Sequence, residues 1–415
     1  MADRAQPRLD YRAEYCRGDL RKQLQAARTV VMPTVPGRVQ VVAAAIIAFV
    51  CCNQGTDSSS FAPIGRAWAT SHPAEGILHA TSGDDIELSW VTDLDLDSEG
   101  RIYVGDGMAD GIVVLDSDLT YSHNIGRRGD GPGEFRSISS VQVVAADSVL
   151  VWDSRLRRAT VFDPAGHDVR TLILRDSEAM PYWAEAIPRD SGYLVLFTPT
   201  YYASGADLQQ PRMNVLRRIV DSPNLADSDS LFAFPAGEAL VWRGQDGRGG
   251  GAVEVGNHPF GSVPFVAVAG ESHVAYATSL ALQVTIIDLG SGVQSGFSYE
   301  TTPVEVTRRQ LNAAKDGMSR RLKKVLEEGA PYTWPPVVGM AVDDQDQIWL
   351  GLRMGDGTNE WAAFTRDGSH VTSVLLPSAF ELYVARGGQL VGVSEDELDV
   401  PRVQVYRFPD DENGA

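Results

Sequence analysis

The hydrophobic and polar positions of this chain repeat one phrase: a short apolar strand, a turn with Asp or Gly, and a second apolar strand that often holds Tyr or Trp. Copies occupy residues 94–106, 143–153, 267–278, 339–351 and 384–393. Short alternating or apolar runs between turn formers are typical of β-strands. One such unit has too little apolar surface to fold alone, so the pattern predicts repeated sheets stacked around a shared core.

The strands group into fours from residue 91 onward, which predicts an all-β chain folded as a six-bladed β-propeller. The predicted blades start at residues 91, 140, 183, 263, 337 and 380, and the third is the least regular. The sixth offers only three strands, so we expect an alternating segment within 76–90 to supply the fourth and close the ring. Five or seven blades are the alternatives. The propeller is then expected to span 76–408, with a polar tail at 409–415.

Three segments carry a resemblance to known repeats: 151–166 (VWDSRLRRATVFDPAG), the turn at 97–100, and 129–135 (GDGPGEF). They resemble repeats of the NHL type and those of related bacterial six-bladed propeller lipoproteins. The likeness is clearest in the first two blades and poorest in the third. It implies a propeller but no particular activity. In the GDGPGEF turn, Glu134 and Phe135 are expected to brace neighbouring blades.

Two segments depart from the strand pattern. Apolar residues spaced by three or four between 304 and 330 predict a helical insertion, whose apolar side we expect to cover blade four or five. Its basic side chains form either a solvated face or a docking surface for an acidic partner or membrane headgroups. Residues 235–261 include a glycine-rich run without the Gly-Lys-Ser/Thr of a phosphate-binding loop, which predicts a flexible interblade loop.

The composition is that of an ordinary folded protein, with 415 residues, 43% hydrophobic and 22% charged. Glycine and proline fall largely between the apolar runs, which favours many turns over long helices. The formal net charge is −19, and because residues 1–52 are net basic, the remaining body is more acidic still. An acidic body repels phosphate backbones, so we expect no nucleic-acid partner.

A signal for export to the cell envelope is predicted near residue 50. Arg38 precedes ten apolar residues at 41–50, a length typical of a signal peptide and too short to span a bilayer. Met32 lies just ahead, so we expect 1–31 to be a disordered upstream extension, 32–52 a signal-like segment and 53–75 a linker. A cytoplasmic protein with a buried strand or helix here is the alternative.

A cysteine directly after the apolar run resembles a bacterial lipoprotein, which makes Cys51 or Cys52 a lipidation candidate. The chain is therefore expected to be exported to the cell envelope, in the periplasm or at the outer surface, with a possible lipid tether to the membrane. Cys16 is the only other cysteine, so the body can hold neither a disulfide nor a thiolate metal site.

Charged residues follow the second strand of several predicted blades, on connections that open onto one rim of the ring. They are either structural hydrogen-bonding corners or ligand contacts, and aromatic residues near irregular loops either line a recognition pocket or pack the blades. The candidate binding residues are Asp106, Asp153, Arg155, Arg157, Arg353, Trp242 and Trp334.

Carboxylates near the first strand raise the alternative of a metal site. Glu87, Asp93 and Asp95 could hold calcium or zinc on the axis of a hydrolase or lyase resembling metal-dependent lactonases, although turn and strand-edge roles are the competing interpretation. The seven histidines show no HxxxH or HExxH spacing and no GxSxG motif occurs, so no catalytic residue is assigned. The leading hypothesis is a monomeric, cofactor-free binding scaffold for a protein, peptide or glycan. A sensor domain of a larger complex is a third reading.

Overall fold

The computed structural model describes Trp68 and residues 88–108, 111–173, 179–186, 192–199, 213–220, 228–245, 251–355, 357–396 and 398–407. The chain divides into two units, residues 1–59 and 60–415, and all described residues belong to the second. The predicted upstream extension, signal segment and tail lie outside the described residues, as does the linker except for Trp68. Within the described part, no helix is long and apolar enough to cross a membrane.

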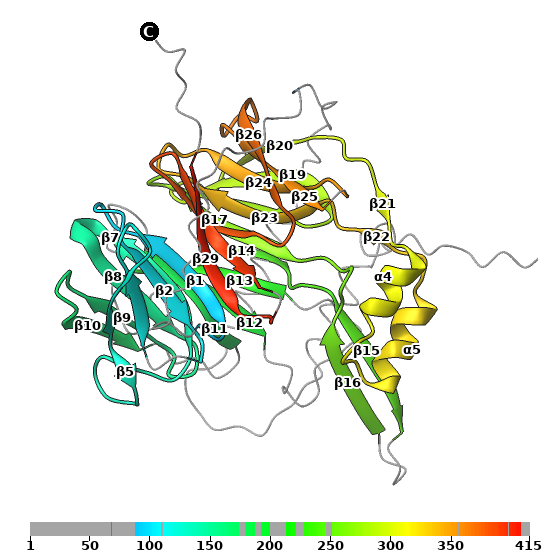
Figure 1. Ribbon diagram of the computed structural model, residues 1–415, viewed down its shortest axis with the longest axis horizontal. Helices are drawn as coiled ribbons and strands as arrows, with labels where there is room; N and C mark the ends of the chain where they lie inside the picture. The colour runs from blue at the N-terminus through cyan, green and yellow to red at the C-terminus, as the bar shows by residue number, and fades with distance from the viewer. Residues whose placement is uncertain are drawn as a thin grey trace, which may run out of the picture. The chain divides into compact units, whose positions relative to one another are not determined.

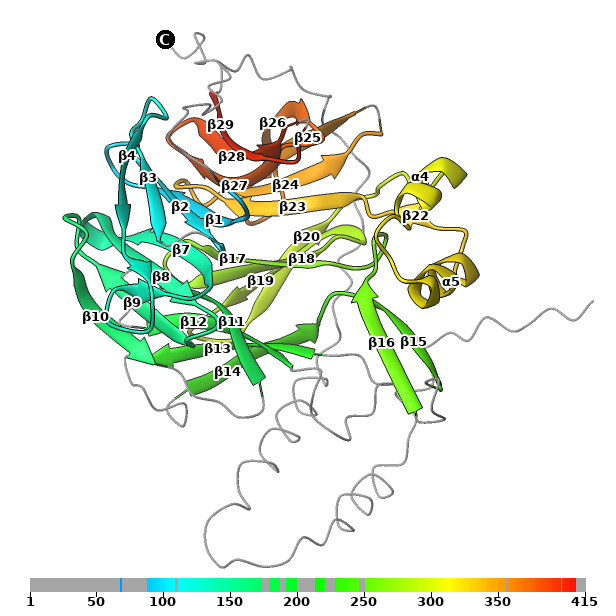
Figure 2. The same cartoon turned by 60° about the horizontal axis from the view of Figure 1, so that its bottom comes forward.

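Six antiparallel sheets form the blades of a β-propeller, as predicted (Figures 1 and 2). Blade 1 contains β1 (Val91–Leu96), β2 (Ile102–Asp106), β3 (Ile112–Leu115) and β4 (Tyr121–Ile125). Blade 2 contains β7 (Ile138–Val144), the short helix η1 (Ala145–Asp147), β8 (Ser148–Asp153), β9 (Arg158–Phe162) and β10 (Asp168–Ile173). Blade 3 contains β11 (Ala179–Ala186), β12 (Gly192–Pro199), β13 (Met213–Val220) and β14 (Ser228–Pro235).

The second half of the ring follows the same order. Blade 4 contains β17 (Pro264–Ala269), β18 (His273–Thr278), β19 (Ala281–Asp288) and β20 (Gln294–Ser298). Blade 5 contains β23 (Val337–Val342), β24 (Ile348–Arg353), β25 (Thr358–Phe364) and β26 (His370–Pro377). Blade 6 contains β27 (Glu381–Arg386), β28 (Gln389–Glu395) and β29 (Pro401–Arg407). The first strand of each blade is its innermost, and these strands line the central channel (Figure 2).

The repeated sequence phrase has a hydrogen-bonding cause at the first turn of a blade. Asp97 Oδ1 accepts the backbone N–H of Arg101 at 2.8 Å, and its Oδ2 accepts the hydroxyl of Tyr103 at 3.1 Å. In blade 5, Asp343 Oδ2 accepts the indole N–H of Trp349 at 2.8 Å while its Oδ1 accepts two backbone N–H groups of the turn. One aspartate therefore holds the turn and satisfies the polar atom of a buried aromatic residue, as burial of such atoms requires.

The apolar core lies between the blades. Tyr103 and Val151 belong to a cluster shared by blades 1 and 2, and Trp349 and Leu382 to one shared by blades 5 and 6. Another cluster joins blade 1 to blade 6 and includes Leu94 and Val391. At these interfaces the described blades bury apolar faces against their neighbours, which is the stacking that the sequence pattern predicted.

Closure of the ring involves these same two blades. Arg386 of blade 6 donates to the carbonyl of Leu96, and the Tyr383 hydroxyl lies 3.5 Å from the carbonyl of Val91. In the described residues blade 6 has three strands, and residues 88–90 are not in a strand. Most of the expected closing segment, 76–87, lies outside the described residues, so that strand stays a prediction.

Trp68 contacts a different part of the ring, at blades 4 and 5. Its indole stacks on His370 with ring centroids 5.1 Å apart and meets the edges of Tyr299 and Phe364. Its Nε1 donates to the carboxylate of Glu360 at 3.1 Å, and that glutamate is fully buried. A residue of the predicted linker is thus part of the blade 4–blade 5 core.

The helical insertion is confirmed as α4 (Arg308–Ala313) and α5 (Arg320–Glu328), and Gly317, with φ of +72°, lies between the two helices. The short strands β21 (Val304–Glu305) and β22 (Thr333–Trp334) pair at its base. The helices do not cover blade 4 or 5 as expected, because Leu322 and Leu326 pack with Leu240 and Phe260 instead.

The partner of these helices is a segment that was predicted to be a loop and is not one. The expected loop at 235–261 contains a β-hairpin of β15 (Ala239–Gln245) and β16 (Gly251–Asn257). Gly256 permits the close approach, since a Cβ there would lie 2.6 Å from Leu322 Cδ1. Of the glycine-rich run, Gly244 and Gly251 lie in the paired strands of the hairpin, and residues 246–250 lie outside the described residues.

The GDGPGEF turn lies between blades 1 and 2 and includes the parallel pair β5 (Arg127–Arg128) and β6 (Glu134–Phe135). Phe135 is buried in the cluster between these blades, with its ring 5.7 Å from that of Phe162. Glu134 Oε2 accepts the backbone N–H of Gly131 at 2.7 Å. These contacts are those expected of an interblade brace.

Candidate functional site

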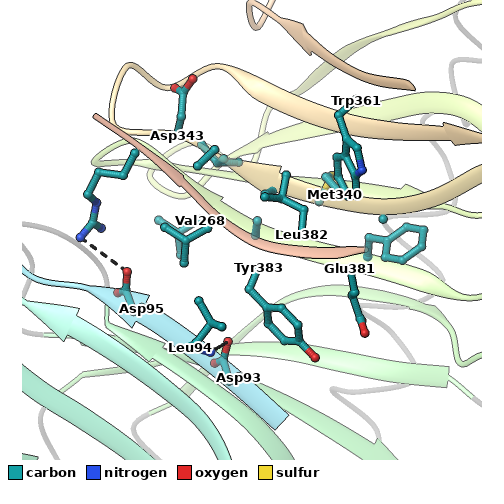
Figure 3. A pocket seen from close by; sticks show the side chains of 18 of the residues that line it. Asp93, Leu94, Asp95, Val268, Met340, Asp343, Trp361, Glu381, Leu382 and Tyr383 are labelled. Carbon is teal, nitrogen blue, oxygen red and sulfur yellow. Dashed lines mark hydrogen bonds and ion pairs between the residues drawn. The ribbon is translucent and has the colours of Figure 1, made fainter. Parts of the chain in front are cut away.

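The innermost strands enclose a cavity of about 880 Å³ in the central channel (Figure 3). Its walls come from β1, β7, β17, β23 and β27, so five blades contribute side chains. A second cavity of about 740 Å³ opens toward the rim that carries residues 137–139 and 394–395. The two cavities share Asp93, Ala379, Glu381 and Tyr383. These four residues therefore mark where the two spaces meet along the channel.

Carboxylates dominate the charge of the larger cavity. Its acidic lining residues are Asp93, Asp95, Glu271, Asp343, Asp344, Asp346 and Glu381. Its basic lining residues are Arg353 and Arg386, and Arg386 lies 3.5 Å from Asp95 Oδ1. A cleft lined by one sign of charge concentrates ligands of the opposite sign. The channel therefore favours a ligand that is cationic, zwitterionic or neutral over a phosphorylated one.

Asp93 and Asp95 join the innermost strands of blades 1 and 2. Asp93 Oδ2 accepts the N–H of Val141 at 2.9 Å, and Asp95 Oδ2 accepts that of Val143 at 2.7 Å. The other oxygen of each accepts the N–H of the residue that follows it, Leu94 or Leu96. The alternation along β1 places both carboxylates toward the edge of β7, where backbone donors lack a ladder partner.

Burial changes the protonation of both side chains. It raises the pKa of Asp93 from 3.8 to about 8, against the lowering effect of the Val141 hydrogen bond, and the negative charge of Asp95 raises it further. Burial also raises the pKa of Asp95, while the nearby Arg386 opposes the change. Asp93 borders the cavity and is partly exposed to it, which places a carboxyl group able to hold a proton near neutral pH inside the channel.

Glu381 and Tyr383 face Asp93 from blade 6, and Figure 3 shows both side chains extending from β27 into the space beside β1. Burial raises the pKa of Glu381, the hydrogen bond from Tyr383 lowers it, and the charge of Glu395 raises it. Sequence reasoning missed both residues. The sequence feature that could have identified them is the alternation of polar side chains along the first strand of blade 6, which was predicted to be its innermost strand.

The wall between blades 5 and 6 was also missed. Trp361 lies across the inner strands of blade 5, where a Cβ at Gly339 or Gly351 would come within 2.7 or 2.9 Å of its ring. Asn359 lines the same wall, and both side chains are buried. Two glycines in adjacent strands opposite one tryptophan were the sequence signal, but their pairing depends on a strand register that the pattern alone does not set.

Asp106 and Asp153 are structural corners in this fold. Both oxygens of Asp153 accept two backbone N–H groups each, from Arg136 and Ser137 and from Arg155 and Leu156, at 2.6 to 3.2 Å. Asp106 accepts N–H groups in the same way, at the start of blade 1 and in its own turn. Both side chains are buried. Of the two interpretations offered by the sequence, a structural corner or a ligand contact, these contacts are those of a structural corner.

The remaining predicted binding residues divide between two places. Arg155 is exposed on the rim, and Arg157 is half-buried in the adjoining turn, with φ of +54°. Trp242 and Trp334 belong to the core of the inserted hairpin and helices, and Trp242 lies 4.1 Å beneath the guanidinium of Arg321. The structure therefore does not gather the predicted set into one site.

Arg353 alone of that set lines the cavity, with its guanidinium 4.5 Å above the ring of Trp334. Arg353 does not occupy the position in its blade that Asp153 occupies in blade 2. The bond from Arg353 N to Pro336 O repeats that from Ser154 N to Ser137 O, so Arg353 corresponds to Ser154, and Leu352 corresponds to Asp153. Both blades have an irregular register at the start of the first strand, in β23 and in β7.

The proposed metal ligands fit a metal ion poorly. Across the described ranges, no three His, Cys, Asp or Glu side chains are grouped so that they could hold one. Asp93 and Asp95 already accept backbone N–H groups, and burial favours their protonated forms, whereas a metal requires the carboxylate. Glu87 lies outside the described residues. Calcium or zinc at these residues stays a prediction.

Comparisons with known proteins agree with the fold. A family model described as a six-bladed β-propeller matches residues 81–217. No curated protein matches the chain. Among solved structures, a protein described as exported, from Bacteroides fragilis, is 12% identical with a TM-score of 0.46, and the match covers 83% of this chain and 98% of that one.

Two further solved structures are similar to this chain over most of its length. The calcium-binding protein regucalcin of Agrobacterium tumefaciens is 10% identical with a TM-score of 0.42, covering 82% of this chain and 98% of that one. Virginiamycin B lyase of Staphylococcus aureus is 11% identical with a TM-score of 0.38, covering 78% and 87%. With TM-scores below 0.5, these likenesses carry no conclusion about this chain's function.

Proposed function

We propose that this chain is an exported, envelope-associated β-propeller that binds a peptide or glycan ligand, free or as part of a protein, in its central channel. The observation that carries the proposal is the cavity of about 880 Å³ lined by the innermost strands of five blades. Ligand sites are commonly concave spaces of roughly 300–1,000 Å³ with a few convergent polar groups. Asp93, Glu381 and Tyr383 supply such groups where this cavity meets the second one.

Export and membrane association are the parts of the proposal that rest on sequence. The apolar run at 41–50 and the cysteines at positions 51 and 52 support a lipoprotein-like leader, in line with the resemblance to NHL-type propeller lipoproteins. Mass spectrometry of the mature N-terminus tests this part. A chain that begins with an acylated Cys51 or Cys52 agrees with it, and an unmodified chain that begins at Met1 contradicts it.

Filling the channel tests the binding site. Ala267 lines the cavity from β17, so Ala267→Trp is expected to occupy part of the space, whereas Val169→Trp adds the same side chain to an exposed position on β10. The probes are a pooled tripeptide library and a panel of glycan fragments, quantified by mass spectrometry after capture on the immobilised protein. We expect the wild type and Val169→Trp to retain the same compounds and Ala267→Trp to lose them.

Two results of this experiment would argue against the proposal. Equal retention by the wild type and Ala267→Trp would place the binding surface outside the channel. A wild-type protein that retains neither class of probe would remove the case for a peptide or glycan ligand. Thermal melts of the three proteins establish that each is folded during the measurement.

The alternative function is a metal-dependent hydrolase or lyase, with calcium or zinc near Asp93 and Asp95. The poor fit of these residues to a metal counts against it. Elemental analysis of the purified protein, followed by assays of lactone and ester hydrolysis before and after chelation, decides between the two. A stoichiometric ion whose removal abolishes hydrolysis would replace the binding proposal.

A further inference from the structure

One corner of the cavity differs in charge from the rest. Arg353 is directly opposite Asn359 in the β24–β25 ladder, and Gly351 is opposite Trp361. Residues opposite one another in antiparallel strands project from the same face, so the three side chains share one face of blade 5. All three line the cavity together with Ser378.

Two polar atoms in this corner are buried without a partner. Asn359 is 3% exposed and Trp361 is 1% exposed. Within the described part of the chain, neither Asn359 Oδ1 nor Trp361 Nε1 makes a hydrogen bond. Buried polar groups are nearly always paired, because an unmade hydrogen bond forfeits the solvation that the group had in water. An acceptor and a donor that lack partners on the same face of β25 indicate a missing third group.

The indole is held in place by its surroundings. Gly339 and Gly351 leave room for the ring, and a side chain at either position would collide with it. Trp361 also packs within the blade 5–blade 6 cluster. The direction of its N–H is therefore set by the fold before any ligand arrives, which lowers the entropic cost of binding.

Arg353 supplies a positive charge on the same face of blade 5. Its Nε donates to the carbonyl of Pro335 at 3.3 Å and its guanidinium stacks on Trp334, so the group is held in position. No carboxylate lies within ion-pair distance of it among the described residues, whereas the cavity's other arginine, Arg386, is paired with Asp95. Burial lowers the pKa of Arg353, which reflects the cost of keeping this cation away from water.

We infer that Arg353, Trp361 and Asn359 form a carboxylate-binding subsite, and that the ligand of the channel is a peptide with a free carboxyl terminus. Arg353 and the Trp361 N–H donate to the terminal carboxylate, and Asn359 Oδ1 accepts the N–H of the last peptide bond. A guanidinium with an added N–H donor matches the two oxygens of a carboxylate. This inference rests on the proposed function and narrows it to one ligand class.

The acidic remainder of the cavity adds a second requirement. A ligand that carried only negative charge would be repelled by carboxylates such as Asp343 and Asp344. A peptide satisfies both regions, because its carboxyl terminus is negative and its amino terminus or a basic side chain is positive. A short peptide also matches the size of the cavity better than an extended chain.

The test compares two probes that differ in a single group: the pooled tripeptide library with free carboxyl termini and the same library as C-terminal amides. We expect the wild type to retain the free acids at least about tenfold more than the amides, the effect of one charged hydrogen-bonded group. Arg353→Gln is expected to abolish this preference. Arg407→Gln, which removes an exposed arginine at the end of β29, is the matched control and keeps it.

Asn359→Asp gives a variant of nearly unchanged shape that places a carboxylate opposite Arg353. It is expected to lower retention of the free acids by at least about tenfold, because the new side chain competes for the guanidinium. The indole N–H resonance of Trp361, assigned as the one lost in Trp361→Phe, is expected to shift when the free-acid pool is added to the wild type.

The outcomes separate this inference from the proposed function. Equal retention of acids and amides, an unmoved Trp361 resonance, or an undiminished preference in Arg353→Gln would overturn the subsite while leaving a channel-binding protein. Retention of glycan fragments without tripeptides would overturn the peptide assignment alone. Loss of all retention in the wild type would contradict both.

Discussion

Replacing Asp93 with Asn is expected to flatten the pH dependence of this protein's stability. The pKa of Asp93 is raised from 3.8 to about 8, mainly by burial. Between about pH 4 and pH 8 the folded protein therefore holds a proton that the unfolded chain releases. The free energy of unfolding falls as the pH rises through this window, since the folded state binds more protons.

The structure sets the size of the effect. Each pKa unit corresponds to about 1.4 kcal/mol, so the full displacement corresponds to about 6 kcal/mol. Asp93 is partly exposed to the cavity, where water screens its charge, and we expect about 2–4 kcal/mol of this to appear. Asn has a single acceptor oxygen, so either the Leu94 or the Val141 N–H loses its partner, at a cost of about 1–2 kcal/mol.

The assay is urea denaturation of wild type and Asp93→Asn at pH 5 and pH 9. At pH 5 the variant is expected to be less stable by about 1–2 kcal/mol, and at pH 9 at least as stable as the wild type. Asp344→Asn, at the exposed mouth of the same cavity, is the control and keeps the wild-type dependence. Parallel pH profiles for wild type and Asp93→Asn would refute the reasoning.

Three further predictions concern stability. Asp153→Ala leaves four backbone N–H groups without their acceptor and is expected to cost about 3 kcal/mol or more in urea denaturation, and a loss under 1 kcal/mol would contradict the structural role. Gly351→Ala places a Cβ against the ring of Trp361 and is expected to cost about 1–3 kcal/mol, visible as a lower Tm; an unchanged Tm would show that the indole lies elsewhere. Trp68→Ala removes a ring from the blade 4–blade 5 core and a hydrogen bond from Glu360, with an expected loss of about 3–5 kcal/mol in urea denaturation; wild-type stability would mean that Trp68 does not dock.

The blades were predictable because their signal is local. Strand alternation and the Asp-containing turns lie within a few residues of one another, and the same aspartates that hold the turns, Asp97 and Asp343, reach the aromatic residues of the next strand. The helical insertion was predictable for the same reason, from apolar spacing and the capping box between Thr307 and Gln310. Its partner was not, because the packing of Leu240 against Leu322 joins residues far apart in the sequence.

The candidate site was predicted only in part, because its residues are brought together by the ring. Arg353 was singled out for its position after a strand, and Asp93 for its place on the first strand. Glu381 and Trp361 were not among the predicted site residues, although they line the same cavity. Asp106 and Asp153 attracted interest as charged residues near a rim, yet their oxygens are all directed at backbone N–H groups.

The sequence alone determines a repeated four-stranded unit, six blades and an acidic body. Each of these depends on spacing, turn chemistry or charge along the chain. Only the tertiary structure decides which side chains meet on the axis, because residues from five blades far apart in sequence line one cavity. Burial is also a tertiary property. It raises the pKa of Asp93 and lowers that of Arg353. It also leaves Asn359 Oδ1 and Trp361 Nε1 without a hydrogen-bond partner among the described residues.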